Sequence, residues 1–184
     1  MLGGSFNPAH DGHRHISLAA LRWLRLDEVW WLVSPQNPLK PVAGMASLAK
    51  RLATAGIVAR HPRIRVTGLE QRLGTRFTAD TLSLLVRRFP RSRFVWLMGA
   101  DNMQQIPHWD RWNRIFRTVA VAVFDRSPYS KGALAGKAAR RFGRWRLRAV
   151  GRLAGVVPPA WVFLHVRPHP ASATAIRRQR PATV

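Results

Sequence analysis

The sequence predicts an α/β protein built on a doubly wound parallel sheet with helices on both faces. Short apolar stretches alternate along the chain with longer segments of helical periodicity, which is the pattern of repeated strand–helix units. Glycine, histidine and carboxylate residues follow several of the apolar stretches, and ligands of such sheets bind beyond the carboxyl ends of the strands. Hydrophobic residues make up 47% of the chain, which is typical of a globular protein.

The first strand–helix unit opens the chain. Only Met1 and Leu2 precede the two glycines, so we expect a short first strand. Residues 11–25 are predicted to form an amphipathic helix, for which Asp11 is a plausible N-cap. The apolar positions of this helix are Ile16, Leu18, Ala19, Leu21 and Leu24.

The second unit contains a proline-rich loop. Residues 28–33 are predicted to form a buried strand. Residues 34–44 are predicted to form a loop, because three prolines would interrupt regular structure there. A helix over residues 47–60, with Ser47 as its cap, is expected to follow.

The remaining units continue the alternation. The further predicted strands span residues 63–67, 93–98, 119–124 and 160–165. The further predicted helices span residues 78–89, residues 109–117 and a basic stretch within 131–154, with Thr78 as a candidate cap of the first. This order is typical of a Rossmann-like sheet, and 184 residues suffice for a single domain over residues 1–184.

The composition excludes several kinds of site. There is no cysteine, which excludes disulfides and thiolate metal sites and fits a cytoplasmic protein. No apolar run reaches the length of about 18 residues that a membrane span needs, and the N-terminus opens on glycines rather than on a signal peptide. We therefore expect no membrane partner. The sequence does not indicate an oligomeric state.

The net charge is strongly positive, at +23, and 27 of the 31 basic residues are arginine. One explanation is a nucleic-acid or membrane partner drawn by a positive field. The other is a GC-rich coding bias in a protein whose substrates are all polyanions. The basic residues are scattered along most of the chain, which favours the second explanation.

The N-terminal string from Gly3 to His13, GGSFNPAHDGH, has the layout of a strand-to-helix phosphate corner. Glycine allows the backbone to approach a ligand closely, and the first turn of a helix offers unpaired N–H groups to an anion. His10 and His13 lie about one helical turn apart, so both can point at one phosphate. A glycine-proline turn with solvated histidines would explain any one of these residues taken alone. It explains the complete string less well than a phosphate site does.

This string resembles the H-x-G-H or T-x-G-H signature of the nucleotidyltransferase superfamily, and its form here is most similar to nicotinate-nucleotide adenylyltransferases. The resemblance implies transfer of the adenylyl group of ATP to nicotinate mononucleotide in NAD biosynthesis. It implies catalytic roles for His10 and His13. It also implies contacts with ATP from the preceding residues, Gly3, Gly4, Ser5 and Phe6. We expect Mg²⁺ to be brought with ATP and no metal site in the protein, since no carboxylate cluster is evident.

A second set of matches follows the strand predicted at residues 93–98. The sequence Gly-Ala-Asp ending at Asp101 resembles the family's nucleotide-site segment, although a turn with an Asx cap would explain it alone. Trp109 resembles the aromatic residue that the family places beside the pyridine ring of the mononucleotide. The flat indole of a tryptophan can stack on such a ring. Core packing is the alternative, and Trp112 is a good candidate for that role.

Residues 75–82, TRFTADTL, resemble the family's S-Y-T-x-D-T-L segment. The implied role is to offer backbone N–H groups near Thr78 to the nicotinate carboxylate, which would help to separate nicotinate from nicotinamide. Phe77 replaces the common tyrosine, so a contact through a phenol hydroxyl is absent. A capped helix start would explain the same residues.

Two basic residues near the proline-rich loop also resemble family positions. Lys40 could reach phosphate as a mobile charge, although a loop lysine can simply be solvated. Arg51 lies on the next predicted helix, where an exposed helical arginine is an equally good explanation.

The C-terminal string ASATAIR resembles the superfamily's I-S-x-T-x-x-R motif, which binds the ATP phosphates. Ser172, Thr174 and Arg177 match the motif, and Ala171 departs from its isoleucine. A serine or threonine can cap a new helix, and an arginine three positions on can project its guanidinium onto phosphate oxygens.

Two alternatives to this function remain. A sister adenylyltransferase could use pantetheine phosphate or nicotinamide mononucleotide, although the pantetheine-phosphate enzymes usually carry threonine where His10 stands. The other alternative is a basic nucleic-acid-binding protein, because residues 131–152 hold eight basic residues and no acid. In that case Arg140, Arg141, Arg144 and Arg148 could line one helix face, with Phe142 and Trp145 on another.

Overall fold

Six parallel strands form one sheet in the order β3-β2-β1-β4-β5-β6 in the computed structural model, which describes residues 1–36 and 44–179. The strands are β1 (Leu2–Gly4), β2 (Val29–Val33), β3 (Ile64–Thr67), β4 (Val95–Gly99), β5 (Ala120–Phe124) and β6 (Trp161–Leu164). The order reverses between β1 and β4, so the chain winds outward in both directions from the middle of the sheet. The predicted doubly wound, Rossmann-like sheet is confirmed.

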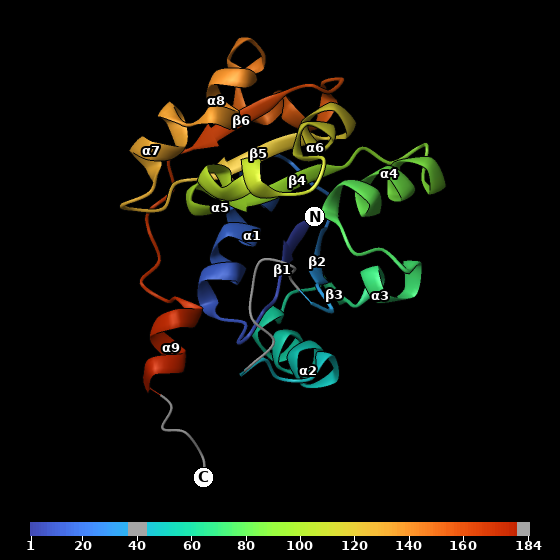
Figure 1. The fold of residues 1–184 in the computed structure, drawn as a ribbon, viewed down its shortest axis with the longest axis vertical. Coiled ribbons are helices and arrows are strands. Elements are labelled where there is room, and N and C mark those ends of the chain that lie inside the picture. The colour runs from blue at the N-terminus through green and yellow to red at the C-terminus, as the bar shows by residue number, and fades with distance from the viewer. Residues whose placement is uncertain (37–43, 180–184) are drawn as a thin grey trace.

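Helices cover both faces of the sheet (Figure 1). One face packs against α1 (Asp11–Trp23), α2 (Leu48–Ala59) and the 3-10 helix η3 (Val150–Gly155). The other face packs against α3 (Leu69–Leu73), α4 (Thr78–Arg88), α5 (Ala100–Gln105), α6 (Trp112–Thr118), α7 (Ser130–Ala135) and α8 (Lys137–Arg141). No helix in these ranges is long and apolar enough to cross a membrane.

Alternation along the central strands explains the two cores. In β4, Trp96 and Met98 join the core under α5 and α6, while Val95 and Leu97 join the core under α1. Successive side chains of a strand point to opposite faces, and both faces are covered. The strands therefore consist of nearly continuous apolar residues, as parallel strands buried on both sides do.

Two helices have their N-cap one residue before the predicted position. The N-cap of α1 is His10 in extended geometry rather than Asp11, because the N–H of His13 donates to the carbonyl oxygen of His10 at 2.9 Å. Asp11 is instead in the first helical turn. In the same way α4 begins at Thr78 with Phe77 as its N-cap. The predicted cap of α2 is confirmed, since the Ser47 hydroxyl accepts from the Lys50 N–H.

Short helices were not predicted. α3 and α5 have five and six residues, too few to show a period of 3.6. The helix predicted over residues 109–117 is found as α6, which begins three residues later, at Trp112, and is preceded by a 3-10 turn, η1 (Ile106–His108). Trp109 lies between the two, so it is held at a bend rather than along a helix face.

The basic stretch is not one helix. It is divided among α7, α8, the 3-10 turn η2 (Gly143–Trp145) and η3, so its arginines do not line a common helix face. Phe142 is buried and stacks on Phe116, with 4.4 Å between ring centroids. The eight basic residues themselves are exposed at the surface.

Candidate active site

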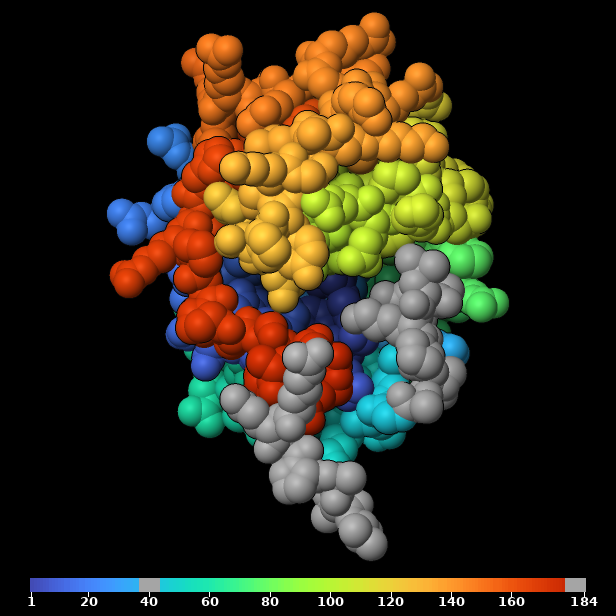
Figure 2. Space-filling model, turned by 60° about the vertical axis from the view of Figure 1, so that its left-hand side comes forward, coloured from blue at the N-terminus to red at the C-terminus, as the bar shows by residue number. Residues whose placement is uncertain are grey.

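Two cavities meet at the carboxyl ends of β1 and β4, where the strand order reverses. We call the one of about 760 Å³ the histidine cavity and the one of about 480 Å³ the tryptophan cavity. Both are lined by Gly3, Gly4, Ser5, Asp101 and Asn102. In Figure 2 a hollow lies between the segment after β5 and the red segment that contains α9 (Ala173–Gln179), with the dark blue N-terminal residues at its floor. Ligands of doubly wound sheets bind at this switch point.

Glycines permit the close packing at this floor. A Cβ atom at Gly3 would overlap the ring of Trp96 on the neighbouring strand β4. A Cβ atom at Gly12 would come within 2.9 Å of the His10 ring and 3.2 Å of the Ala171 carbonyl oxygen. The glycines therefore bring together β1, β4, α1 and the segment that leads into α9.

The rings of the two predicted histidines lie close together at the start of α1, tilted by 37° with 3.9 Å between their centroids. The backbone N–H of His10 donates to Nδ1 of His13 at 3.2 Å, so the ring proton of neutral His13 is on Nε2. Phe6 packs on His13 at 4.7 Å and stacks on Trp31 at 5.1 Å, which holds the His13 ring from behind. Both histidines line the histidine cavity.

His10 has a strongly altered environment. Its pKa is lowered to about 4, first by burial and then by the nearby charges of Arg126 and His169, while the charge of Asp11 acts in the opposite direction. Its Nδ1 is buried without a hydrogen-bond partner among the described residues. The ring is therefore neutral at pH 7, and a phosphate bound beside it would raise the pKa again.

The C-terminal motif closes the histidine cavity. The guanidinium of Arg177 donates to the carbonyl oxygen of Asn7 at 2.6 Å and to Oγ1 of Thr174 at 3.3 Å. The Ser172 hydroxyl accepts from the Ala175 N–H at 3.1 Å, which confirms it as a cap. Ser172, Thr174 and Arg177 all line the cavity, so the two ends of the chain meet there as the motifs predict.

Asp101 occupies the boundary between the two cavities. Its Oδ2 accepts from the Arg126 guanidinium at 2.8 Å, and its Oδ1 is buried without a hydrogen-bond partner in the described part of the chain. Sequence reasoning missed Arg126, which follows β5 directly. Its position beyond the carboxyl end of a central strand was the signal that could have found it.

The tryptophan cavity contains the residues predicted for the mononucleotide. Thr78 and Trp109 line it, together with Arg76 and Phe77. Trp112 packs in the core, where it is 9% exposed and meets Phe116 edge-on at 6.2 Å. Trp109 is partly buried against the same core and also lines the cavity.

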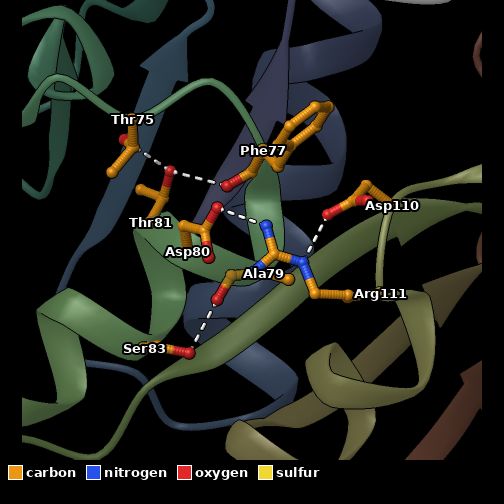
Figure 3. A network of polar contacts seen from close by, with 8 residues as sticks. All are labelled: Thr75, Phe77, Ala79, Asp80, Thr81, Ser83, Asp110 and Arg111. Atoms are coloured by element: carbon orange, nitrogen blue, oxygen red, sulfur yellow. Dashed lines mark hydrogen bonds and ion pairs between the residues drawn. The ribbon is translucent and has the colours of Figure 1, made fainter.

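Hydrogen bonds hold the turn over residues 75–78, and ion pairs join the first turn of α4 to residues 110 and 111 (Figure 3). The Thr81 hydroxyl on α4 lies 2.8 Å from the Thr75 hydroxyl and donates to the Phe77 carbonyl oxygen at 3.2 Å. On the other side Arg111 bridges Asp80 at 2.7 Å and Asp110 at 2.5 Å. We call residues 75–78 the acceptor turn.

Glu70 is a buried carboxyl group in the tryptophan cavity that no sequence motif indicated. Burial raises its pKa to about 7, although the hydroxyls of Ser34 and Thr81 act in the opposite direction and favour the ionised carboxylate. The residue is 6% exposed. A glutamate in a short helix with no recognisable period carries no signal of burial.

Arg51 is buried rather than exposed, which corrects one of the explanations that the sequence allowed. It is 2% exposed, and burial lowers its pKa. Its guanidinium donates to four carbonyl oxygens from three parts of the fold. These are Ala46 at 2.9 Å, Ser5 at 2.8 Å, Ser34 at 2.6 Å and Pro35 at 2.8 Å.

Lys40 lies outside the described residues. Within the ranges that are described, no three His, Asp or Glu residues are grouped so that they could hold a metal ion.

Comparisons with known proteins match this arrangement. A model of the cytidylyltransferase-like family matches residues 1–179. A probable nicotinate-nucleotide adenylyltransferase of Parvibaculum lavamentivorans is 52% identical over 97% of this chain and 90% of its own length. Another of Cereibacter sphaeroides is 55% identical over 96% of this chain and 95% of its own length.

Solved structures share the fold. The Plasmodium falciparum nicotinic acid mononucleotide adenylyltransferase complexed with NaAD superimposes with a TM-score of 0.72 over 96% of this chain and 80% of its own, at 16% identity. Sequence identity as low as 16% shows a common fold only. The bacterial relatives, in contrast, are similar in sequence over nearly their whole length, which shows the family. The chain therefore belongs to the cytidylyltransferase-like proteins and, among them, to the family of nicotinate-nucleotide adenylyltransferases.

Proposed function

We propose that this chain transfers the adenylyl group of ATP to nicotinate mononucleotide, giving nicotinate adenine dinucleotide and pyrophosphate in NAD biosynthesis. The observation that carries the proposal is the pair of cavities with a common floor. The residues matched to the ATP motifs line one cavity, and those matched to the mononucleotide segments line the other. Two substrates bound in these cavities would meet beside Gly3, Gly4 and Asp101. The names of the relatives support the same reaction.

The chemistry requires no covalent enzyme intermediate. An oxygen of the mononucleotide 5′-phosphate attacks the α-phosphorus of ATP in line, and the bond from that phosphorus to the bridging oxygen of the β-phosphate breaks. Pyrophosphate leaves with the electron pair of that bond. Because the nucleophile is already an anion, the protein contributes position and stabilisation of charge.

The histidine cavity would supply that stabilisation. Nε2–H of His13 and the neutral ring of His10 donate hydrogen bonds to phosphoryl oxygens as charge develops. Ser172, Thr174 and Arg177 hold the β- and γ-phosphates from the other end of the chain. The backbone from Gly3 to Phe6 forms the floor on which the phosphates lie.

The tryptophan cavity would hold the acceptor. The indole of Trp109 stacks on the pyridine ring, and backbone N–H groups at Thr78 receive the nicotinate carboxylate. Asp101 accepts hydrogen bonds from ribose hydroxyls at the boundary of the two cavities. Lys40 is assigned to phosphate by resemblance alone.

Mg²⁺ would enter as part of the ATP substrate. The polar groups around the histidine cavity are mainly imidazoles, hydroxyls and guanidiniums, which suit phosphate oxygens rather than a hard divalent cation. The ion would therefore be held mainly by the triphosphate and by water. We also propose that residues 1–184 act as a single nucleotidyltransferase domain.

A pyrophosphate-release assay with purified protein, Mg·ATP and nicotinate mononucleotide tests the proposal. Release that depends on the mononucleotide is expected, and His13→Ala is expected to abolish most of it. His61→Ala, which lines neither cavity, is the matched control and should keep the wild-type rate. Absence of release, or full activity of His13→Ala, would contradict the assignment.

The same assay separates the sister reactions. Pantetheine phosphate and nicotinamide mononucleotide are offered as acceptors at equal concentration. We expect the highest kcat/KM with nicotinate mononucleotide, because Thr78 and Trp109, which match the mononucleotide segments of the family, both line the tryptophan cavity. A higher kcat/KM with pantetheine phosphate would replace the proposed acceptor.

A further inference from the structure

Arg76 is the one arginine among the residues that line the tryptophan cavity in the described part of the chain. It belongs to the acceptor turn, and the S-Y-T-x-D-T-L segment that residues 76–82 resemble has serine at this position. The reaction as proposed gives Arg76 no part, although the cavity is proposed to receive a carboxylate. The role of this arginine therefore bears on which acceptor the cavity selects, and this reasoning rests on the proposed function.

The guanidinium of Arg76 lies over the ring of Phe77, with 5.6 Å from Cζ to the ring centroid. Such a cation–π contact restricts the motion of an exposed arginine and does not occupy the N–H groups at the edge of its guanidinium. Arg76 forms no ion pair within residues 1–36 and 44–179. Its charge and its donors therefore stay available to a ligand.

Arg111 takes up two carboxylates close to the acceptor turn (Figure 3). Its guanidinium donates to Oδ2 of Asp80 at 2.7 Å, in the first turn of α4, and to Oδ2 of Asp110 at 2.5 Å. Asp80 lies four positions after Arg76, and Asp110 lines the tryptophan cavity. Arg111 thus compensates both negative charges and leaves Arg76 unpaired.

The other two carboxyl groups of the cavity lining do not pair with Arg76 either. Asp101 accepts from the Arg126 guanidinium at 2.8 Å. Glu70 is 6% exposed and forms no ion pair with any arginine or lysine that the structure describes. No acid of the described chain therefore neutralises the charge that Arg76 brings to this cavity.

The backbone of Arg111 is left-handed, at φ 46° and ψ 36°. Residues other than glycine, asparagine and aspartate seldom adopt this conformation. Left-handed residues of other types persist where their surroundings hold them, and here the side chain is held by ion pairs with Asp80 and Asp110. An arginine at a position that favours glycine indicates that its side chain has a role.

We propose that Arg76 is a specificity-determining residue of the tryptophan cavity, which binds the carboxylate of the nicotinate head group. Arg111 acts as a positioning residue, because its two ion pairs keep the neighbouring acids from Arg76. The carboxylate accepts charge-assisted hydrogen bonds from the guanidinium, in addition to those from backbone N–H groups near Thr78. The uncharged amide of nicotinamide mononucleotide gains much less from the same cation. One side chain thus detects the charge by which the two acceptors differ.

The kinetic test is the ratio of kcat/KM for nicotinate mononucleotide to that for nicotinamide mononucleotide, at constant pH and Mg·ATP. Arg76→Gln is expected to lower this ratio about fivefold to tenfold, mainly by raising KM for nicotinate mononucleotide. KM for ATP and the melting temperature should stay at their wild-type values, because the side chain is exposed and does not line the histidine cavity.

Arg72→Gln is the matched control, because Arg72 is an exposed arginine of α3 that lines neither cavity. It removes the same charge four positions away and should keep the wild-type ratio. An unchanged ratio in Arg76→Gln, or an equal fall in both variants, would overturn the proposal.

Ionic strength supplies a readout that a merely structural role would not move. Salt screens the attraction between exposed charges, so we expect the wild-type ratio to fall about threefold between about 0.05 M and 0.5 M salt. The ratio of Arg76→Gln should change much less. Effects of salt on ATP and on the shared 5′-phosphate cancel in the ratio. Equal salt dependence of the two proteins would contradict selection by the charge of Arg76.

Arg111→Asn tests the positioning role. Asparagine adopts the left-handed conformation more readily than arginine, so the turn is kept while Asp80 and Asp110 lose their partner. We expect the ratio to fall about threefold, because the freed acids compete for Arg76 and repel the carboxylate. Replacement of both acids by asparagine in this variant should restore the wild-type ratio. A ratio that stays low would show that Arg111 only holds the turn.

Binding in the absence of ATP separates this proposal from the proposed function. Calorimetric titration with nicotinate mononucleotide, and with nicotinamide mononucleotide as the second probe, measures recognition alone. We expect Arg76→Gln to bind the nicotinate form about fivefold to tenfold more weakly and the nicotinamide form as the wild type does. Equal affinities of both proteins for nicotinate mononucleotide, with adenylyl transfer intact, refute the role of Arg76. Binding that depends on Arg76, without transfer by the wild type, refutes the proposed function instead.

Discussion

The histidine cavity and the tryptophan cavity share a floor but are built on different principles. The first joins segments from both ends of the chain, and buried atoms at its edge, such as His10 Nδ1 and Asp101 Oδ1, have no partner in the described ranges. The second is bordered by the acceptor turn, in which the Thr75 hydroxyl and the Phe77 carbonyl oxygen are both bonded by the hydroxyl of Thr81. Buried polar groups cost free energy until they are satisfied. The first cavity thus keeps its hydrogen-bonding capacity for a ligand, while the second uses it to hold a shape.

His10 offers the largest test of this contrast. Because its ring serves a ligand rather than the fold, His10→Ala is expected to lower kcat by about 10²- to 10³-fold. KM for nicotinate mononucleotide should change little, and the melting temperature should stay within a few degrees of the wild type. Steady-state kinetics measure kcat and KM, and thermal unfolding measures the melting temperature. A large loss of stability with a small loss of kcat would mean that His10 belongs to the scaffold.

Arg51 tests the opposite assignment, that of a residue serving the fold. Arg51→Met keeps most of the side-chain volume but leaves four buried carbonyl oxygens without their donor. We expect a loss of about 4 kcal/mol in the free energy of unfolding, measured by urea denaturation. Lys50→Met, at the exposed neighbouring position on α2, is the control and should cost less than about 0.5 kcal/mol. Equal stability of the two variants would contradict this role.

Glu70 predicts a pH dependence of stability. Its folded pKa of about 7 lies above the ordinary value of 4.5, so the folded form binds the proton more tightly than the unfolded form. Its contribution is fully present below pH 4.5 and is lost as the pH rises towards 7, by about 3 kcal/mol at most. Glu70→Gln should therefore be more stable than the wild type at pH 8 and not at pH 4.5. Denaturation curves at both pH values measure the difference, and parallel pH profiles of the two proteins would disprove it.

Trp109 tests the tryptophan cavity through binding alone. Trp109→Ala removes the surface on which the pyridine ring stacks, and we expect KM for nicotinate mononucleotide to rise about tenfold. KM for ATP should stay within about twofold, because the ATP motifs line the other cavity. Trp23→Ala, at an exposed tryptophan, is the control. A rise in KM for ATP of the same size would mean that the cavities do not divide the substrates as proposed.

The basic surface gives the smallest expected effect on catalysis. The eight basic residues from Lys131 to Arg152 are exposed and lie on short helices and turns outside the polar contacts of the acceptor turn. Replacing Arg140 and Arg144 by glutamine should leave kcat/KM within about twofold at 0.15 M salt. A salt titration of DNA binding by the wild type is the companion measurement. Tight binding with a steep salt slope and no adenylyl transfer would favour the nucleic-acid-binding alternative.

Most of the architecture could be predicted from local pattern. Strands such as β4 and β5 are continuous apolar runs, because both of their faces are buried, and long helices such as α1 show their amphipathic period. α3 and α5 could not be predicted, since helices shorter than two turns show no period. The caps of α1 and α4 were each misplaced by one residue because the backbone, rather than the side-chain type, sets the first turn.

The motif residues came together for a reason that the sequence contains. Parallel strands end at one edge of the sheet, so residues placed just after β1 and β4 had to meet there. The resemblance had assigned the C-terminal motif to the ATP phosphates, and it meets the N-terminal string through a contact that was not predicted, from Arg177 to the carbonyl oxygen of Asn7. The sequence by itself thus determined the fold class and the place of the site.

Only the tertiary structure decided what Arg51, Glu70 and Arg126 do. Each is a charged residue that belongs to no recognisable sequence pattern. Its burial and its hydrogen-bond partners therefore cannot be predicted from the sequence around it. Arg51 is buried by contacts with segments up to 46 positions away, and Arg126 meets Asp101 across 25 positions. The energetics of a charge depend on what surrounds it, and the surroundings are assembled from parts of the chain that share no local pattern.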